Sequence, residues 1–502
     1  MSDTEFSDAL DAHLVRNGFI WGPEPEIYDS LAGFYTYGPM GKLLKEKMER
    51  RMKRVFRQEE FYEVEAPIIM PREVWKASGH LDTFVDPMIL CSECDGSFRA
   101  DKLIEEEHDV VADGFSDKEL LQFIEDHGIT CPNCGGDFEQ RIEDYNLMMK
   151  TEVAGREAYA RPETATTTYL PFKRYWRFFR KQLPIKVFQI GKAFRNEISP
   201  RQHVLRGREF TQAEGQVFVT EEMKHDWDGY DAVKDDEVRL WSAAEQETDG
   251  EPVAMTLAEA VETGEVSSQG YAWCLAVAWE LFRSVGIPAE RMRFREHQED
   301  EKAHYATDAW DLEVRLDSFG WTECCGVHDR GSYDLQQHTE HAPEDLSFKD
   351  NHGEEVTPHI LEIAFGTDRP TFALLDIFFD MEEERLQLPR HVAPVDVGVF
   401  PLMAKDGLDE TADELCKQLR EQRFDVEYDD SGSIGKRYAR HDAKGTPLCV
   451  TVDYETDEDG TVTLRERDTA DQVRVGIDGL AETVRNYLYG GADLQELGEP
   501  VE

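Results

Sequence analysis

The feature that most constrains the fold is a polar, arginine-bearing segment, 194–210, that lies between two apolar runs. The runs cover Val187–Ile190 and Val217–Val219. Short apolar runs separated by polar, turn-forming residues are typical of paired strands, so we expect an antiparallel hairpin with a long loop. Because Arg forms planar bidentate hydrogen bonds and keeps its charge, Arg195 and Arg206 suit a polyphosphate. A purely structural, salt-bridged hairpin is the alternative interpretation.

The same segment contains groups that suit a purine base. Phe210 offers an aromatic face for stacking, and Glu197 offers an acceptor for an exocyclic amino group. A second segment, Gly366–Arg369, follows an apolar run and leads into an apolar helix that we expect over Thr371–Phe379. Together the two segments place arginines and an aromatic ring where a nucleoside triphosphate would need them.

The composition is strongly acidic. Asp and Glu number 105 against 55 Lys and Arg, which gives a formal net charge of −50. Such a charge normally argues against a nucleic-acid partner. It is typical either of an acidic, partly disordered protein or of a halophilic protein adapted to a high-salt cytosol. Aromatic residues make up 11% of the chain, which favours the folded, salt-adapted protein.

Basic residues are concentrated in two blocks. Pro171–Arg208 contains eleven Lys or Arg and one acidic residue, and Lys42–Arg57 contains eight basic and two acidic residues. Phosphate groups are the usual partner of such local charge in an acidic protein. A solvated basic helix face is the alternative.

Two C-x-x-C pairs indicate a metal site. They are Cys91 with Cys94, and Cys131 with Cys134, separated by 36 residues. Four thiolates at this spacing can close a tetrahedral zinc site, and a site with no open position is structural. Two redox-active or buried cysteine pairs are the alternative.

Three segments follow one another along the chain: a basic helix that we expect over Met40–Phe56 with a strand ending at Pro67, the arginine hairpin, and Gly366–Arg369. In this order they resemble motifs 1, 2 and 3 of class II aminoacyl-tRNA synthetases. Further runs narrow the resemblance to glycyl-tRNA synthetases of the archaeal and eukaryotic dimeric type. These runs are Tyr159–Ala165, Arg195–Arg201, Arg208–Glu214, Arg293–His297, His304–Ala306, Asp308–Asp311, Gly320–Glu323 through Asp329–Arg330, Tyr333–Leu335 and, near the C-terminus, Asp429–Tyr438.

The resemblance implies a set of site residues. ATP would be bound by Arg195, Asn196, Glu197, Leu205, Arg206, Phe210, Glu323, Cys324, Gly366 and Arg369, with Arg195 and Arg369 catalytic and magnesium near Glu323. Glycine would be bound by Arg99, Glu163, Phe210, Gln212, Glu214, Glu362 and Gly366. It also implies glycine--tRNA ligase activity, with tRNA(Gly), glycine and ATP as partners and a homodimer formed through motif 1.

One position departs from the family pattern. The family has a serine that helps to bind glycine where this chain has Ala364. The sequence leaves open whether a water molecule or another hydroxyl replaces it. Alternatives to glycine are threonine, proline or histidine as the activated amino acid. A non-catalytic synthetase-like protein that binds nucleic acid is a third possibility, although such proteins tend to lose the ATP arginines.

The implied fold class is an α+β catalytic domain on a mostly antiparallel sheet, with an inserted zinc module and a C-terminal α/β anticodon-binding domain. The expected division is the motif 1 part at 1–86, zinc insertion at 87–140, motif 2 part at 141–220, acidic helical insertion at 221–285, motif 3 part at 286–388, anticodon-binding domain at 389–490 and tail at 491–502.

The expected location is the cytoplasm, without a membrane partner. The first residues are acidic and lack the apolar segment of a signal peptide, and no apolar run reaches the roughly 18 residues of a membrane span. Nine cysteines, an odd number, argue against a secreted disulfide framework.

Overall fold

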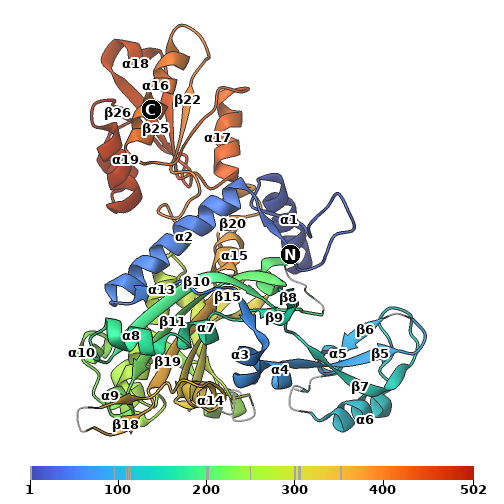
Figure 1. Cartoon of the computed structure of the whole chain (residues 1–502). Coiled ribbons are helices and arrows are strands. Elements are labelled where there is room, and N and C mark those ends of the chain that lie inside the picture. Colours follow the sequence, from blue (N-terminus) through green and yellow to red (C-terminus); the bar gives the residue numbers. More distant parts are fainter. Residues whose placement is uncertain are drawn as a thin grey trace.

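The computed structural model describes residues 3–94, 96–108, 110, 112, 115–198, 200, 203–248, 250–298, 301–302, 307–350 and 353–501. Of the sequence motifs above, Ser199, Arg201 and the run 304–306 lie outside these residues. Figure 1 shows a large central unit, a smaller unit containing β22 and α16 at one end, and a third containing β5 and α6 at the side.

A nine-stranded, mostly antiparallel sheet forms the central unit. Its strand order is β13-β12-β14-β15-β16-β19-β11-β10-β3, and only the β12–β14 and β10–β3 pairs are parallel. In that order the bounds are Val253–Thr256, Glu237–Trp241, Met292–Glu296, Asp308–Leu316, Gly320–Gly331, His359–Gly366, Glu209–Val219, Ile185–Phe194 and Tyr62–Glu63. The predicted hairpin is present: β10 and β11 pair antiparallel from Ile185↔Phe218 to Phe194↔Glu209.

Alternation along the central strands separates an apolar face from a polar one. On β11, Ala213 and Val217 belong to the main hydrophobic core, whereas Gln212 and Glu214 point into the cavity described below. Successive side chains of a strand point to opposite faces, so one sheet buries its apolar face under helices and keeps a polar face for ligands. The covering helices are α2 (Pro39–Gln58) and α13 (Gln269–Ser284).

Close packing of α2 on the sheet depends on a glycine. A Cβ atom at Gly215 would lie 2.7 Å from Cε1 of Phe56, so only glycine allows that ring to rest on β11. The ring of Phe56 also stacks on Phe188 of β10, with centroids 4.7 Å apart. Pro39 starts α2, where the missing N–H of proline has no helical partner to lose. The predicted helix over Met40–Phe56 is therefore present and slightly longer.

The segment 221–285 is not a separate helical unit. It contributes β12 and β13 to the central sheet, and α13 is one of the most deeply buried helices of the chain. Its other helices are α9 (Glu221–His225), α10 (Tyr230–Val233), α11 (Ala243–Glu247) and α12 (Leu257–Thr263). Strands as short as β12 and β13 carry little periodicity, so the acidic side chains between them made the segment resemble a surface insertion.

The helix after Gly366 begins earlier than predicted. It is α15 (Asp368–Ile377), not Thr371–Phe379. Pro370 is compatible with this earlier start, because proline is tolerated in the first turn of a helix, where N–H groups have no partner within the helix. The earlier start places Asp368 and Arg369 in that first turn, at the end of β19 and facing the hairpin.

The two smaller units have their own sheets and cores. Near the four cysteines, β6 (Ser97–Arg99), β5 (Val85–Cys91) and β7 (Phe138–Asn146) pack against α5 (Ala100–Glu107) and α6 (Asp117–His127), so this unit extends beyond the predicted 87–140. A three-stranded sheet joins it to the centre: β4 (Ile69–Pro71), β9 (Arg156–Ala160) and β8 (Lys150–Val153).

The C-terminal unit has a six-stranded sheet with a separate core. Its strands, in order, are β23 (Val426–Tyr428), β22 (Val397–Pro401), β24 (Leu448–Val452), β25 (Thr461–Glu466), β26 (Gln472–Gly476) and β27 (Glu499–Pro500). Its helices include α16 (Leu408–Glu421), α17 (Ile434–Ala443) and α19 (Leu480–Tyr489). Among the described residues, no helix combines the length and apolarity needed to cross a bilayer.

Candidate active site

A cavity of about 660 Å³ lies over the polar face of the central sheet. Strands β11, β16 and β19 and the loop that follows β10 supply most of its wall, and the first turn of α15 supplies one end. It brings together most of the predicted residues. They are Arg195, Glu197, Leu205, Arg206, Phe210, Glu323, Cys324, Gly366 and Arg369 of the ATP set, and Glu163, Gln212, Glu214 and Glu362 of the glycine set.

Two predicted residues do not line the cavity. Asn196 donates its backbone N–H to Leu147 O at 2.7 Å and so ties the hairpin loop to the chain before β8. Arg99 forms an ion pair with Asp86 at 3.1 Å and with Asp101, within the small sheet of the cysteine unit. Only the Asn196 contact reaches the hairpin, whereas the ion pairs of Arg99 stabilise the cysteine unit itself.

One end of the cavity is rich in guanidinium groups. The Arg195 guanidinium lies over the ring of Phe210, 5.4 Å from its centroid, and its Nε donates to Pro162 O at 3.1 Å. Arg206 Nε donates to Glu197 Oε2, also at 3.1 Å. These contacts orient two arginines and one ring along the same wall. This end can bind a polyphosphate and stack a planar base.

The third arginine of this end comes from α15. Arg369 Nη1 lies 2.9 Å from Oε1 of Glu323, and the charge of Arg369 lowers the pKa of Glu323. Both side chains are substantially exposed to the cavity. A β-bulge where β15 pairs with β16, between Leu312 and Glu313, places Glu323 and Cys324 together on the cavity wall.

Asp368 fixes the position of Arg369. Its Oδ2 accepts the backbone N–H of Thr211 at 2.7 Å, and its Oδ1 accepts the hydroxyl of Tyr37 at 2.7 Å and an ion pair from Lys45. Burial would raise the pKa of Asp368, but Lys45 and the hydrogen bonds from Thr211 and Tyr37 together outweigh burial, and the pKa lies below its ordinary value. A buried, ionised carboxylate thus ties α15 to the hairpin and to α2.

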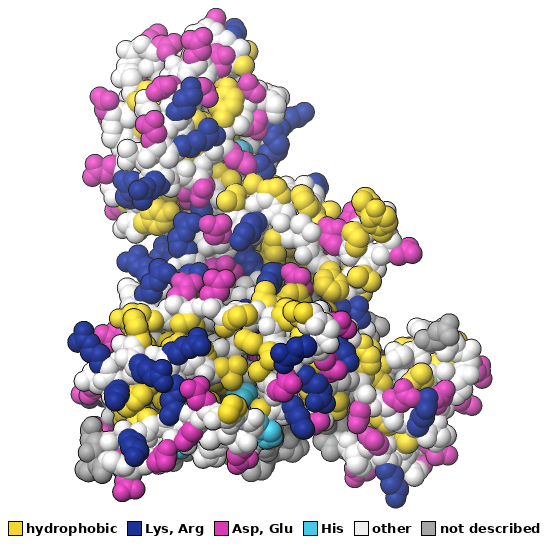
Figure 2. Space-filling view, in the orientation of Figure 1, with side chains coloured by type: hydrophobic (Ala, Val, Ile, Leu, Met, Phe, Trp, Pro, Cys, Tyr) yellow, Lys and Arg dark blue, Asp and Glu magenta, His cyan; other side chains and the backbone are white. Residues whose placement is uncertain are grey.

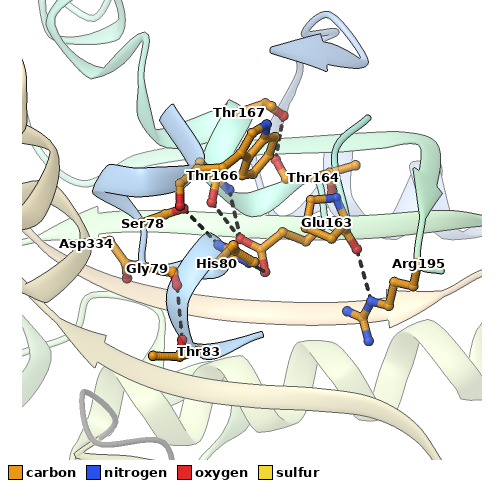
Figure 3. Close-up of polar contacts among 12 residues, drawn as sticks. Ser78, Gly79, His80, Thr83, Glu163, Thr164, Thr166, Thr167, Arg195 and Asp334 are labelled. Atoms are coloured by element: carbon orange, nitrogen blue, oxygen red, sulfur yellow. Dashed lines mark hydrogen bonds and ion pairs between the residues drawn. The ribbon is translucent and has the colours of Figure 1, made fainter. Parts of the chain in front are cut away.

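The other end of the cavity is rich in carboxylates. Glu163 follows β9, Glu214 lies on β11 and Glu362 lies on β19. Glu163 Oε1 accepts the hydroxyl of Thr166 at 2.7 Å, and its Oε2 lies 3.5 Å from Nε2 of His80 (Figure 3). Burial would raise the pKa of Glu163, but His80 and then Arg330 outweigh burial, and the pKa is lowered.

Glu362 is held from several sides. Its Oε2 accepts Tyr169 OH and Gln216 Nε2, both at 2.8 Å, and its Oε1 accepts Arg330 Nη1 at 3.1 Å and His328 Nδ1 at 3.2 Å. Burial alone would raise its pKa, but Arg330 and His328 lower it to about 2. Glu362 is therefore an ionised, rigid part of the wall.

Glu214 differs from its two neighbours. Its Oε2 accepts a hydrogen bond from the neutral hydroxyl of Thr164 at 2.6 Å. Burial, followed by the charges of Glu362 and Glu163, raises its pKa well above the ordinary value. Nearby, Oε1 of Gln212 is buried and has no hydrogen-bond partner among the described residues. Within the described residues, Glu214 has no ion-pair partner and Oε1 of Gln212 has no donor, and an ammonium group would supply both.

Four side chains that contact the carboxylates were not among the predicted site residues. His80, Tyr169, His328 and Arg330 all contact the carboxylates, from segments far apart in the chain. His328 and Arg330 lie on β16 two residues apart and on the cavity side. The alternation along 322–330 could have indicated them, because residues Thr322, Cys324, Gly326, His328 and Arg330 all line the cavity.

The four predicted cysteines form a cluster outside the cavity. Cys91 Sγ lies 3.5 Å from Cys134 Sγ, and Cys94 Sγ lies 3.7 Å from Cys131 Sγ. These separations are too long for disulfides and close to the roughly 3.8 Å edge of a tetrahedron with 2.3 Å Zn–S bonds. All four Sγ atoms lie within 4.8 Å of one another, so the cluster fits a tetrahedral metal ion.

Comparisons with known proteins agree with this geometry. Residues 148–244 match the tRNA synthetase class II core domain (G, H, P, S and T), and residues 396–487 match the anticodon binding domain. Prolyl-tRNA synthetases share the fold: that of Giardia lamblia in complex with prolyl-adenylate has a TM-score of 0.62 at 15% identity, covering 96% of this chain and 75% of that one. That of Cryptosporidium parvum with halofuginone and AMPPNP has a TM-score of 0.60 at 18% identity, covering 97% and 78%.

Sequence relatives are more specific. The glycine--tRNA ligase of Thermococcus sibiricus is 37% identical, over 96% of this chain and 99% of that protein. The glycine--tRNA ligase of Methanothermobacter thermautotrophicus is 41% identical, over 93% of this chain and 97% of that protein. These relatives favour glycine over the threonine, proline and histidine alternatives and confirm the predicted fold class and family. The chain belongs to the glycine--tRNA ligase family of class II aminoacyl-tRNA synthetases.

Proposed function

We propose that this chain activates glycine with ATP to form glycyl-adenylate and then transfers glycine to the 3′ end of tRNA(Gly). The observation that carries the proposal is the polarity of the cavity. Arg195, Arg206 and Arg369 lie at one end, and Glu163 and Glu214 lie at the other. A bound ATP and a bound glycine would then meet between them, with opposite charges facing opposite walls.

At the ATP end, each group has a distinct role. Phe210 stacks on adenine and Glu197 accepts its amino group. Arg206 and Arg369 bind the outer phosphates, and Arg195 bridges the α-phosphate and the carboxylate of glycine. The contacts that hold Arg195 on Phe210 and Arg369 on Glu323 support these roles, because they orient the guanidinium groups before the substrate arrives.

At the glycine end, Glu163 and Glu214 receive the ammonium group. The unpaired acceptor of Gln212 adds a third contact. Glu362 acts differently: its four donors occupy both oxygens, so it holds Arg330 and His328 in place. Where the family has a serine, Ala364 lies on β19 opposite Glu214. Hydroxyls of Thr164 and Thr166 contact the two ammonium-binding carboxylates instead.

The adenylation step needs alignment and charge neutralisation. A carboxylate oxygen of glycine attacks the α-phosphorus, and the bond to the pyrophosphate oxygen breaks. No proton is removed from the attacking oxygen, so no general base is required. Arg195 and Arg369 neutralise the charge that develops on the phosphates. Glu323 is the residue that would hold magnesium, which supplies further positive charge to the phosphates when bound.

A bound tRNA would contact both large units. Residues 396–487 match an anticodon binding domain, and basic side chains gather along α2 between that unit and the central sheet (Figure 2). Four of them, Lys42, Arg50, Arg54 and Arg57, are exposed on α2. This local charge offsets the net charge of −50 where phosphates would lie.

The cysteine cluster would hold a structural zinc ion. The four thiolates satisfy the metal completely, and the cluster belongs to the core of its own small unit. The ion would supply folding energy to this unit and take no part in adenylation.

A homodimer would form at the edge of the central sheet beside motif 1. The edge strand β3 exposes 54% of Tyr62, and α8 (Phe172–Phe178) exposes 69% of Phe178. The two rings lie 6.1 Å apart and make one apolar patch at a free strand edge. Free edges and apolar patches of this kind are typical of contact surfaces.

The acidic surface would adapt the protein to a salt-rich cytoplasm, where ATP and tRNA are present. We also propose that the chain is divided into seven segments: 1–86, 87–140, 141–220, 221–285, 286–388, 389–490 and 491–502. The second of these belongs to a unit that extends beyond 87–140, and the fourth is part of the central sheet.

The test is amino-acid-dependent ATP–pyrophosphate exchange in molar potassium chloride. We expect exchange with glycine and charging of tRNA(Gly). Exchange with alanine, serine, threonine, proline or histidine in place of glycine would contradict the substrate assignment. A folded protein that supports no exchange with any amino acid would contradict the enzymatic function and favour a nucleic-acid-binding role.

A further inference from the structure

A cluster of two histidines and one aspartate lies on the cavity wall, and none of the three residues was assigned above to bind ATP or glycine. His297 follows β14, Asp311 lies on β15 and His328 lies on β16. One ligand atom from each lies within 4.8 Å of the others. All three side chains face the cavity. The strand register brings Asp311 and His328 together. Asp311 pairs with Gly326 across the β15–β16 ladder, and His328 lies two residues from Gly326, on the same face of β16.

The orientation of His328 suits a metal ligand. Its Nδ1 lies 3.2 Å from Oε1 of Glu362, an acceptor, so Nδ1 donates and Nε2 keeps its lone pair. A Cβ atom on Gly326 would lie 3.1 Å from that Nε2 and 3.4 Å from Oδ1 of Asp311, so Nε2 and the carboxylate border the same small space. A carboxylate behind one ring nitrogen and a ligand at the other is the usual arrangement of a metal-bound histidine.

The other two members are held together and partly desolvated. His297 Nε2 lies 2.7 Å from Oδ2 of Asp311, and Asp311 is buried. Glu323 is the nearby group whose negative charge acts on Asp311. A carboxylate that is both buried and close to another negative charge gains stability when a cation binds.

We propose that His297, Asp311 and His328 bind one divalent transition-metal ion of the Zn²⁺ class. Two imidazole nitrogens and one carboxylate oxygen suit Zn²⁺, Co²⁺ or Mn²⁺, whereas Mg²⁺ prefers oxygen ligands alone. Three protein ligands leave a coordination position open, and that position faces the cavity. The site is separate from the four cysteines and differs in chemistry from the magnesium position at Glu323.

Occupancy of this site inhibits glycine binding. His328 contacts Glu362, and the charge of Glu362 acts on Glu214, the residue proposed to bind the glycine ammonium. A doubly charged ion on His328 therefore repels the ammonium and attracts the carboxylates that would bind it. The expected effect is a higher KM for glycine with added metal, and a smaller effect on kcat.

The experiment uses the full chain with its cysteine cluster loaded with zinc, and Co²⁺ as the probe. Absorption spectra separate the two sites, because thiolate ligation gives intense charge-transfer bands and nitrogen–oxygen ligation gives only weak d–d bands. The variants are His328→Ala and His297→Gln. The matched control is His341→Ala, an exposed histidine of α14 (Tyr333–His341) outside the cluster.

The wild type and His341→Ala are expected to bind about one further Co²⁺ per chain without charge-transfer bands. Each cluster variant is expected to bind it at least ~10-fold more weakly. Added Co²⁺ or Zn²⁺ is expected to raise the glycine KM of the wild type and not that of the cluster variants. Zinc content and unfolding temperature verify that each variant is folded. If His328→Ala is not folded, the Co²⁺ affinity of His297→Gln tests the proposal.

The proposal is overturned if the wild type binds no further ion, or if both cluster variants bind it as tightly as the wild type. Exchange activity is a separate readout, measured in enzyme that keeps zinc at its cysteine cluster after a chelator has removed other ions. An enzyme that is active but binds no further Co²⁺ contradicts this site alone and leaves the synthetase assignment intact.

Discussion

Lys45 and Lys47 lie two residues apart on α2, and their ammonium groups bind carboxylates in different units of the protein. Lys45 forms an ion pair with Asp368 beside the cavity, whereas Lys47 Nζ lies 2.8 Å from Oδ1 of Asp396 in the C-terminal unit. Residues two apart on a helix point about 200° from each other. One turn of α2 therefore connects the ATP end of the cavity to the unit that matches an anticodon binding domain.

Breaking the second of these ion pairs is expected to uncouple the two units. In Lys47→Met, Asp396 would remain buried without its cation, and the loss of one partner of a buried pair costs about 3–5 kcal/mol. We expect tRNA charging to fall much more than glycine-dependent pyrophosphate exchange, and the C-terminal unit to unfold at lower denaturant. Arg16→Ala is the control: its ion pair with Glu384 is exposed and contributes roughly 0–1 kcal/mol. Equal losses of exchange and charging would contradict the coupling.

Removal of the Arg195 guanidinium is expected to abolish adenylate formation. Arg195→Ala leaves the developing charge at the α-phosphate unopposed, and the loss of one such donor typically costs ~10²–10³ in kcat. Pyrophosphate exchange measures the effect, and light scattering should show an unchanged oligomeric state. Arg177→Ala, an exposed arginine of α8, should leave exchange unchanged. Near-normal exchange in Arg195→Ala would rule out the proposed role.

Glycine binding is expected to strengthen as the pH rises. Burial, then Glu362 and Glu163, raises the pKa of Glu214 above the ordinary value of 4.5, so the free enzyme carries a neutral carboxyl there below the raised pKa. Binding of an ammonium favours the ionised form, so the KM for glycine should fall as the pH passes through the raised pKa. Steady-state kinetics across pH should show this fall in the wild type, and a high, flat KM in Glu214→Gln.

The same raised pKa makes a prediction for stability. A carboxyl whose folded-state pKa is raised contributes stability that is fully present below the unfolded pKa and is lost as the pH rises through the folded pKa. The unfolding free energy of Glu214→Gln should therefore improve relative to wild type as the pH rises above about 4.5. Chemical denaturation at several pH values measures the difference. A difference that is constant with pH would argue that Glu214 is ionised throughout.

Metal removal is expected to unfold the cysteine unit locally. A tetrahedral cysteine site stabilises a small core that would be marginal without it, so chelation or Cys94→Ser should make residues 85–146 sensitive to protease while the central sheet stays protected. Cys416→Ser, a buried cysteine of α16 outside the cluster, should keep the full zinc content. Zinc loss without any change in the digestion pattern would show that the unit folds without metal.

Salt is expected to stabilise the fold and support activity. The formal net charge of −50 creates repulsion that counterions screen, with a Debye length of about 3 Å at 1 M salt against about 10 Å at 0.1 M. The unfolding temperature and the exchange rate should both rise from low to molar potassium chloride. An activity optimum at low salt would argue against the halophilic interpretation of the composition.

Much of the ATP end could be predicted from the sequence because it is local. Arg195, Arg206 and Phe210 belong to one hairpin, and the apolar runs on either side of it indicate its strands. Arg369 lies shortly after the end of another strand, β19. The order of these segments also pointed to the class II fold, which the family matches confirm. For the same reason the C-terminal strands β22, β24 and β25 coincide closely with three strand-like runs of the sequence, Val395–Leu402, Leu448–Asp453 and Thr461–Arg465.

The carboxylate end was predicted only in part. Glu163 and Glu214 came from the family resemblance, but the partners that decide their charge could not be seen in the chain. His80 reaches Glu163 from more than eighty residues earlier, and Arg330 reaches Glu362 from a neighbouring strand. Asn196, next to Arg195 in the chain, lies outside the cavity wall because its backbone bonds Leu147.

The sequence by itself therefore determined the family, the fold class and the chemical types of the groups that meet ATP, because these depend on local strand patterns and on residue order. Only the tertiary structure decided which carboxylate is ionised, which acceptor lacks a partner, and that His297, Asp311 and His328 share one space. The physical reason is that pKa values and ligand geometry depend on burial and on distances of a few ångströms between strands. Those distances follow from sheet register, which no single segment of the chain specifies.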